Sequence, residues 1–124
     1  MKATSPDFQK ALAHGLRLFN AGNFFEAHEV WEEIWRKADP LEKLWLQGLI
    51  QTAVGFHHLQ NHNRRGARSL LRNAIEKLSR ADRPNFPFDL PPLLTDLRRI
   101  LLVLENESSP LPKKLPILKM HRPR

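Results

Sequence analysis

Apolar residues recur every three to four positions along most of the chain, which is the period of amphipathic helices. Capping residues and prolines mark where these helices begin, as in Ser5-Pro6-Asp7 and Asp39-Pro40. Asn23 and Glu26 together resemble a capping box. The five expected helices follow Ser5, Asn23, Asp39, Asn63 and the loop before Pro91, and the last four end near Lys37, Asn61, Ser79 and Glu105.

The expected fold is all-α, because no segment shows the alternation typical of a strand. A faint repeat at a spacing of forty matches Asn23 with Asn63 and Ala27 with Ala67. We therefore predict a compact bundle of two antiparallel helix hairpins, weakly similar to tetratricopeptide repeats and capped by the fifth helix. Residues 1–105 form one predicted domain, and residues 106–124 a proline-rich basic tail docked on the bundle or on a partner subunit of a homo-oligomer.

Composition narrows the functional classes. The chain of 124 residues has no cysteine, which excludes disulfides and thiolate zinc sites. No apolar run approaches the length of a membrane span and no hydrophobic signal segment follows Met1, so the expected location is the cytoplasm, without membrane association. The net charge of +7 is concentrated in residues 61–124, which carry fourteen Lys or Arg and six Asp or Glu.

A stripe of polar residues interrupts the otherwise apolar third helix. A helix turns about 100° per residue, so Gln47, Gln51 and His58 fall within roughly 40° of one another. On the second helix, His28 and Glu32 are four residues apart and so are neighbours at the edge of its apolar face. A short turn joins the two helices, which should pack antiparallel. We therefore expect these five side chains to form a buried polar cluster.

Three interpretations of this cluster stay open. It could be a satisfied structural network that fixes the helix register. It could be a divalent metal site with His28, Glu32 and His58 as ligands, although the second histidine of the zinc-protease helix is absent. It could also be a general acid–base site in which Glu32 orients His28. Neither a reaction nor a substrate follows from these residues alone.

Longer motifs identify a family resemblance. Residues 19–35, residues 47–53, His58 and residues 63–67 closely resemble the signature of the domain-of-unknown-function family 309. This resemblance covers roughly residues 8–80 and implies a small all-helical bundle without an established activity. The fifth helix and the tail lie outside it. The family motif marks Glu26, His28, Glu29, Glu32, Trp35, Gln51 and His58.

The basic second half supplies a competing function. Arg64, Arg68 and Arg72 are four residues apart on the fourth helix, with Arg65 beside them, and could form a phosphate-binding stripe. The leading hypothesis is a small cytosolic protein whose His/Glu/Gln cluster binds a small ligand or a metal ion. The alternative is a helical interaction module in which the cluster is structural and the basic face binds RNA or an acidic protein.

Overall fold

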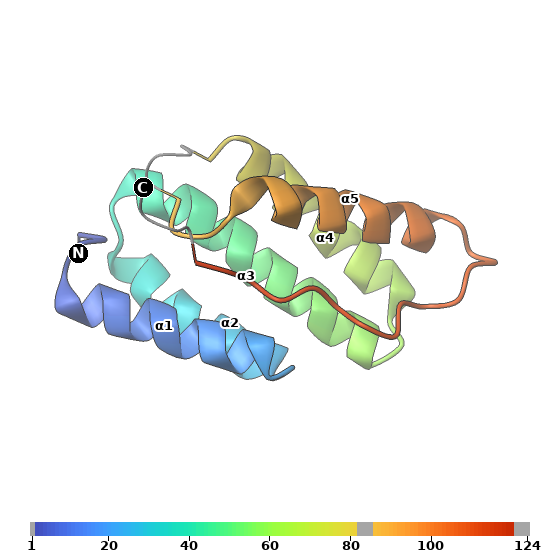
Figure 1. Cartoon of the computed structure of the whole chain (residues 1–124), viewed down its shortest axis with the longest axis horizontal. Coiled ribbons are helices and arrows are strands. Elements are labelled where there is room, and N and C mark those ends of the chain that lie inside the picture. The colour runs from blue at the N-terminus through green and yellow to red at the C-terminus, as the bar shows by residue number, and fades with distance from the viewer. Residues whose placement is uncertain (1, 82–85, 121–124) are drawn as a thin grey trace.

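Five helices account for most of the computed structural model, which describes residues 2–81 and 86–120. These helices are α1 (Pro6–Asn20), α2 (Phe24–Lys37), α3 (Pro40–Gln60), α4 (Arg64–Ser79) and α5 (Leu90–Glu105). Each helix packs against the next one in the chain, and Figure 1 shows successive helices running antiparallel. The predicted all-α bundle is therefore confirmed, and the β-pairing within the described ranges is one isolated bridge between Phe88 and Met120.

The repeat of forty residues is visible in the backbone. Gly22 and His62 occupy equivalent positions, and both have positive φ angles, of 84° and 58°. The next residue differs in its role. Asn63 caps α4, because its Oδ1 accepts a hydrogen bond from the Gly66 amide at 2.9 Å, whereas Asn23 makes no side-chain cap to α2. Asn23 therefore occupies the predicted N-cap position of α2, but the side-chain hydrogen bond expected of a capping box is absent.

The residue forty positions before His58 explains this difference. His58 Nδ1 lies 3.2 Å from Asn63 Nδ2 and so holds the amide with its oxygen toward α4. The equivalent residue in the first unit is Leu18, which has no side-chain group to orient Asn23. The cap therefore depends on a histidine that only one of the two units carries.

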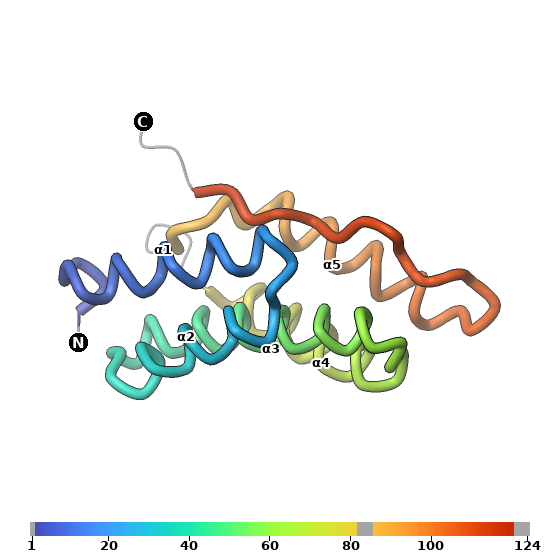
Figure 2. The backbone as a smooth tube through the Cα atoms, turned by 90° about the horizontal axis from the view of Figure 1, so that it is seen from below, coloured from blue at the N-terminus to red at the C-terminus, as the bar shows by residue number. Residues whose placement is uncertain are grey.

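The helices form two layers. Figure 2 shows α2, α3 and α4 side by side in one layer and α1 and α5 in the other. The tail, residues 106–120, returns along the second layer, and in Figure 1 it runs between α1 and α5. Loop residues 82–85 and tail residues 121–124 lie outside the described residues.

Large aromatic side chains fill the space between the layers. Trp31 is fully buried and its Nε1 donates to the carbonyl of Leu12 at 3.3 Å. Gly15 makes room for this ring, because a Cβ atom on Gly15 would overlap the indole of Trp31. The glycine thus lets α1 approach α2 closely. Further buried aromatic residues are Phe8, Phe19, Phe24, Trp45, Phe56, Phe86 and Phe88.

Candidate functional site

The predicted stripe lies on the side of α3 that faces away from the core. Trp45 and Phe56 point inward, where their rings contact Phe8 of α1 and Phe19. Gln47, Gln51 and His58 lie on the opposite side of the helix by its geometry, and all three side chains are half-buried. The prediction of a buried cluster is therefore wrong. The apolar side of α3 that carries Trp45 and Phe56 packs against the core. The polar stripe on the opposite side therefore lies at the surface, between α2 and α4.

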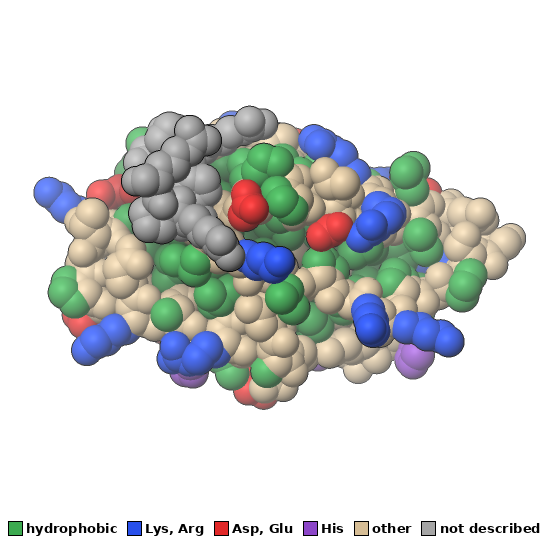
Figure 3. All heavy atoms as spheres, viewed as in Figure 1, with side chains coloured by type: hydrophobic (Ala, Val, Ile, Leu, Met, Phe, Trp, Pro, Cys, Tyr) green, Lys and Arg blue, Asp and Glu red, His purple; other side chains and the backbone are tan. Residues whose placement is uncertain are grey.

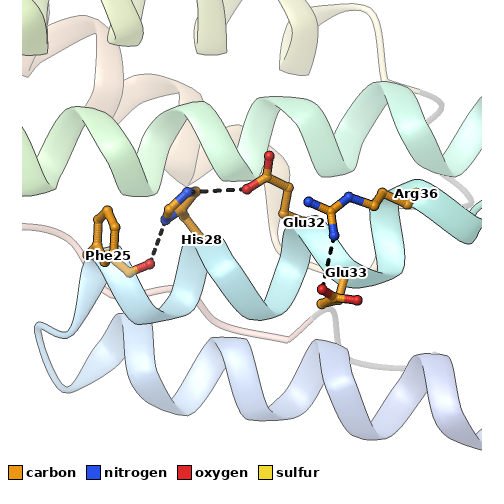
Figure 4. A network of polar contacts seen from close by, with 5 residues as sticks. All are labelled: Phe25, His28, Glu32, Glu33 and Arg36. Atoms are coloured by element: carbon orange, nitrogen blue, oxygen red, sulfur yellow. Dashed lines mark hydrogen bonds and ion pairs between the residues drawn. The ribbon is translucent and has the colours of Figure 1, made fainter.

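His28 and Glu32 form a contact on α2 as their spacing predicts. The distance from His28 Nε2 to Glu32 Oε2 is 3.3 Å, and 17% of the His28 side chain and 45% of the Glu32 side chain are exposed. Figure 4 shows both side chains directed toward α3, apart from the separate ion pair between Glu33 and Arg36. The pair is therefore anchored on one helix and accessible from solvent.

A second contact orients the imidazole of His28. Its Nδ1 lies 2.6 Å from the carbonyl oxygen of Phe25, which can only accept a hydrogen bond, so Nδ1 is the donor of this contact. The ring is therefore held between the Phe25 carbonyl at Nδ1 and the Glu32 carboxylate at Nε2.

Gln51 of α3 and Trp35 of α2 each carry a buried polar atom. Gln51 Oε1 and Trp35 Nε1 are buried and have no hydrogen-bond partner among the described residues. Two contacts show the register between α2 and α3. Lys43 Nζ lies above the Trp35 ring at 4.7 Å, and the ring centroids of Phe25 and His57 are 5.2 Å apart. This antiparallel register places Gln51 level with the turn of α2 that carries His28 and Glu32.

His58 belongs to a different contact network. Its Nδ1 accepts from Asn63, and its ring packs against Gly66 at the start of α4. No three His, Asp or Glu side chains in the described ranges are grouped closely enough to hold a metal ion. The predicted ligand set of His28, Glu32 and His58 is therefore not assembled. These residues do lie on the neighbouring helices α2 and α3, but the His58 side chain is turned toward α4.

An exposed aromatic residue was missed in the sequence. Phe25 is 49% exposed, and its ring centroid lies 4.8 Å from that of His28 and 5.2 Å from that of His57. The signal was present, because Phe25 directly precedes Glu26 on a helix whose exposed side is otherwise polar. Both Glu26 and Glu29, which the motif also marks, are exposed.

The predicted basic face is partly used inside the fold. The Arg64 guanidinium donates to the carbonyl oxygens of Asn106, at 3.2 Å, and of Ser109, just beyond the end of α5. Arg72 forms an ion pair with Glu105 at 2.9 Å. Both arginines thus hold the last turn of α5 and the start of the tail against α4. Of the predicted four, Arg65 is exposed and Arg68 is half-buried.

Comparison with known proteins identifies the domain to which these helices belong. The model of the family described as "Domain of unknown function (DUF309)" matches residues 12–70. These residues form a DUF309 domain. It extends from within α1 into α4 and contains the whole of α2 and α3, whereas α5 and the tail lie outside the matched residues. The His28–Glu32 pair, Gln51 and Phe25 therefore all lie within the matched residues.

The chain is also similar to an uncharacterized protein of Aquifex aeolicus (strain VF5), to which it is 30% identical over 59 residues. The similarity covers 46% of this chain but only 17% of the relative. Among the described residues, no helix is both long enough and apolar enough to cross a membrane.

Proposed function

We propose that the outer face of α2 and α3 binds a small planar molecule that carries hydrogen-bonding groups at its edge. The exposed ring of Phe25 supports this proposal most directly. It is held in place by contacts with two imidazoles, at 4.8 and 5.2 Å between centroids, yet half of its surface stays accessible. A fixed, accessible aromatic ring is a platform on which a flat heterocycle stacks, and such stacking contributes about 1–3 kcal/mol.

Polar groups beside this platform would recognise the edge of the ligand. Glu32 offers a carboxylate that is 45% exposed, and His28 holds its imidazole Nε2 at 3.3 Å from this carboxylate. The amide of Gln51 is level with this pair and half-buried. A ligand with an adjacent donor and acceptor, such as a carboxamide or a nucleobase, would complement these groups. Small-molecule sites commonly combine an apolar surface with a few placed polar groups in this way.

Titration with nicotinamide tests the proposal, with cyclohexanecarboxamide as a ligand of similar size that lacks the flat ring. We expect nicotinamide to bind and the saturated amide to bind at least about fivefold more weakly, since it loses the stacking contribution. Phe25→Leu keeps an apolar side chain but removes the flat ring on which the ligand stacks. It should lower the affinity for nicotinamide by a similar factor.

Glu32→Gln tests the edge contacts, and Glu33→Gln is its matched control. Both substitutions remove one negative charge from α2, but Glu33 pairs with Arg36 away from the proposed site. We expect only Glu32→Gln to weaken nicotinamide binding. If nicotinamide, adenine and uracil all fail to bind at millimolar concentration in nuclear magnetic resonance titrations, the proposal is wrong.

A further inference from the structure

The tail leaves a cavity between itself and the bundle. This cavity has a volume of about 720 Å³, which is within the size range of small-molecule pockets. It lies at the end of the molecule where α1 ends, α2 begins and α3 ends, and tail residues 111–113 and 115–117 form its outer wall. The lining residues from the bundle are Phe19, Asn20, Ala21, Gly22, Phe24, Leu59, Gln60 and His62.

The cavity has an apolar floor and an apolar outer wall. Phe19, Phe24 and Leu59 are each at most 6% exposed and belong to the hydrophobic core. From the other side, Leu111 and Leu115 of the tail are partly buried and pack against this core. An alkyl chain placed between the two walls would be removed from water on both sides, which is favourable by about 0.8 kcal/mol for each buried methylene group.

The charged and polar groups of the lining point to the opposite end of the ligand. Lys113 and His62 contribute the ionisable side chains, and none of the lining residues is Asp or Glu. The two amides are already engaged, because Asn20 bonds to the backbone of Leu118 and Gln60 donates to the carbonyl of Gly22 at 2.8 Å. Figure 3 shows this face of the molecule, where apolar side chains are interspersed with Lys and Arg.

We propose that this cavity binds a medium-chain fatty acid, with the alkyl chain between the aromatic floor and the tail and the carboxylate at Lys113. The apolar walls select an alkyl chain, and the cationic lining without a carboxylate selects an anion over a cation. The site is formed by α1, the α1–α2 turn, the end of α3 and the tail, so it is independent of the proposed face around Phe25.

Isothermal titration with octanoate, octan-1-ol and octylamine tests this site. Octanoate should bind with one-to-one stoichiometry, octan-1-ol more weakly, and octylamine most weakly. Lengthening the chain from hexanoate to octanoate should strengthen binding by about fourfold for each methylene group that becomes buried. If octanoate does not bind up to its solubility, or if octylamine binds as tightly as octanoate, the proposal is wrong.

Two adjacent lysines provide a matched pair of variants. Both lysines line a second cavity between the tail and α5, but only Lys113 also lines the cavity proposed to bind octanoate. Lys113→Glu and Lys114→Glu change the net charge equally, and both residues are exposed, so neither variant should disturb folding. We expect the affinity for octanoate to fall about three- to tenfold in Lys113→Glu and less than about twofold in Lys114→Glu. Equal effects would mean that octanoate responds only to the overall charge, which would overturn the proposed site.

A second matched pair tests the apolar wall. Ile117 is 58% exposed and lines the cavity, and Leu102 is 69% exposed on α5 away from it. Ile117→Gln should weaken octanoate binding, and Leu102→Gln should leave it unchanged. If neither variant changes the affinity, the alkyl chain is not bound between the tail and the bundle and the proposal fails.

Discussion

Asn20 binds the main chain of Leu118 on both of its polar sides. Its Nδ2 donates to the Leu118 carbonyl at 3.1 Å, and its Oδ1 accepts from the Leu118 amide at 2.9 Å. Leu118 itself is 4% exposed, so this paired contact fixes a buried anchor of the tail to the last residue of α1. A similar contact follows nearby, where the Asp89 amide donates to the carbonyl of Lys119 at 2.9 Å.

Replacing Asn20 should release the tail while leaving the five helices folded. Asn20→Leu removes both hydrogen bonds, and we expect the free energy of unfolding to fall by about 1–2 kcal/mol. Hydrogen exchange of the Leu118 amide, measured by nuclear magnetic resonance, should accelerate strongly. Asn20→Asp keeps the acceptor for this amide but loses the donor, so its effect should be intermediate. Unchanged exchange in Asn20→Leu would show that apolar contacts alone hold the tail.

Gly15 should tolerate no side chain. In Gly15→Ala the new Cβ would overlap the rigid, fully buried ring of Trp31, so we expect the free energy of unfolding to fall by about 3 kcal/mol. Gly48→Ala is the comparison, because its Cβ would meet the flexible end of Leu78 at 2.7 Å. Both changes gain helix propensity of about 1 kcal/mol. Chemical denaturation should therefore show a much larger loss at position 15, and a reversed order would contradict this packing.

Arg64 should stabilise the end of α5. Arg64→Gln removes a charged donor from the carbonyl oxygens of Asn106 and Ser109, and we expect the free energy of unfolding to fall by about 1–2 kcal/mol. Arg65→Gln is the control, since it makes the same change of charge at an exposed neighbour. Denaturation midpoints of the two variants would separate the roles. If both are as stable as the wild type, Arg64 is available for phosphates and the basic-face hypothesis gains ground.

Gln51→Leu should preserve or raise stability. The substitution removes a buried acceptor that has no partner among the described residues, so we expect a gain between zero and about 1 kcal/mol. The same variant should weaken nicotinamide if Gln51 contacts the ligand. Gln47→Leu, one turn away on the same stripe, serves as the control for added apolar surface. A loss of more than about 1 kcal/mol in Gln51→Leu would instead indicate a structural role for this amide.

Helix positions were accessible from sequence because local signals set them. Ser5 caps α1 as predicted, with Oγ accepting from the Phe8 amide at 3.2 Å, and α2 and α4 end at Lys37 and Ser79 as expected. These signals act within one turn of the chain. The missing cap at Asn23 shows their limit, since its counterpart works through His58, five residues away and on the preceding helix.

The candidate site was harder to predict because it depends on how neighbouring helices rotate about their axes. The spacing of His28 and Glu32 fixed their mutual contact, which involves a single helix. Whether the stripe on α3 faces the core or solvent is decided by where α4 packs. Gly48 and Gly55 lie on a different side of α3 from the stripe, and Leu78 and Leu71 of α4 pack against them. Because α3 is apolar on most sides, the spacing of its residues alone did not indicate which sides would be covered by neighbouring helices.

The surroundings of α3 constrain how this protein can diverge. Core aromatics, α2 and α4 occupy three sides of the helix, and a substitution there requires a matching change in another helix. Gln47 and Gln51 point in the remaining direction and are half-buried, whereas His58 contacts Asn63 and Gly66 at the start of α4. Single substitutions at Gln47 and Gln51 therefore require no matching change in another helix, so this face of α3 can change without repacking the core.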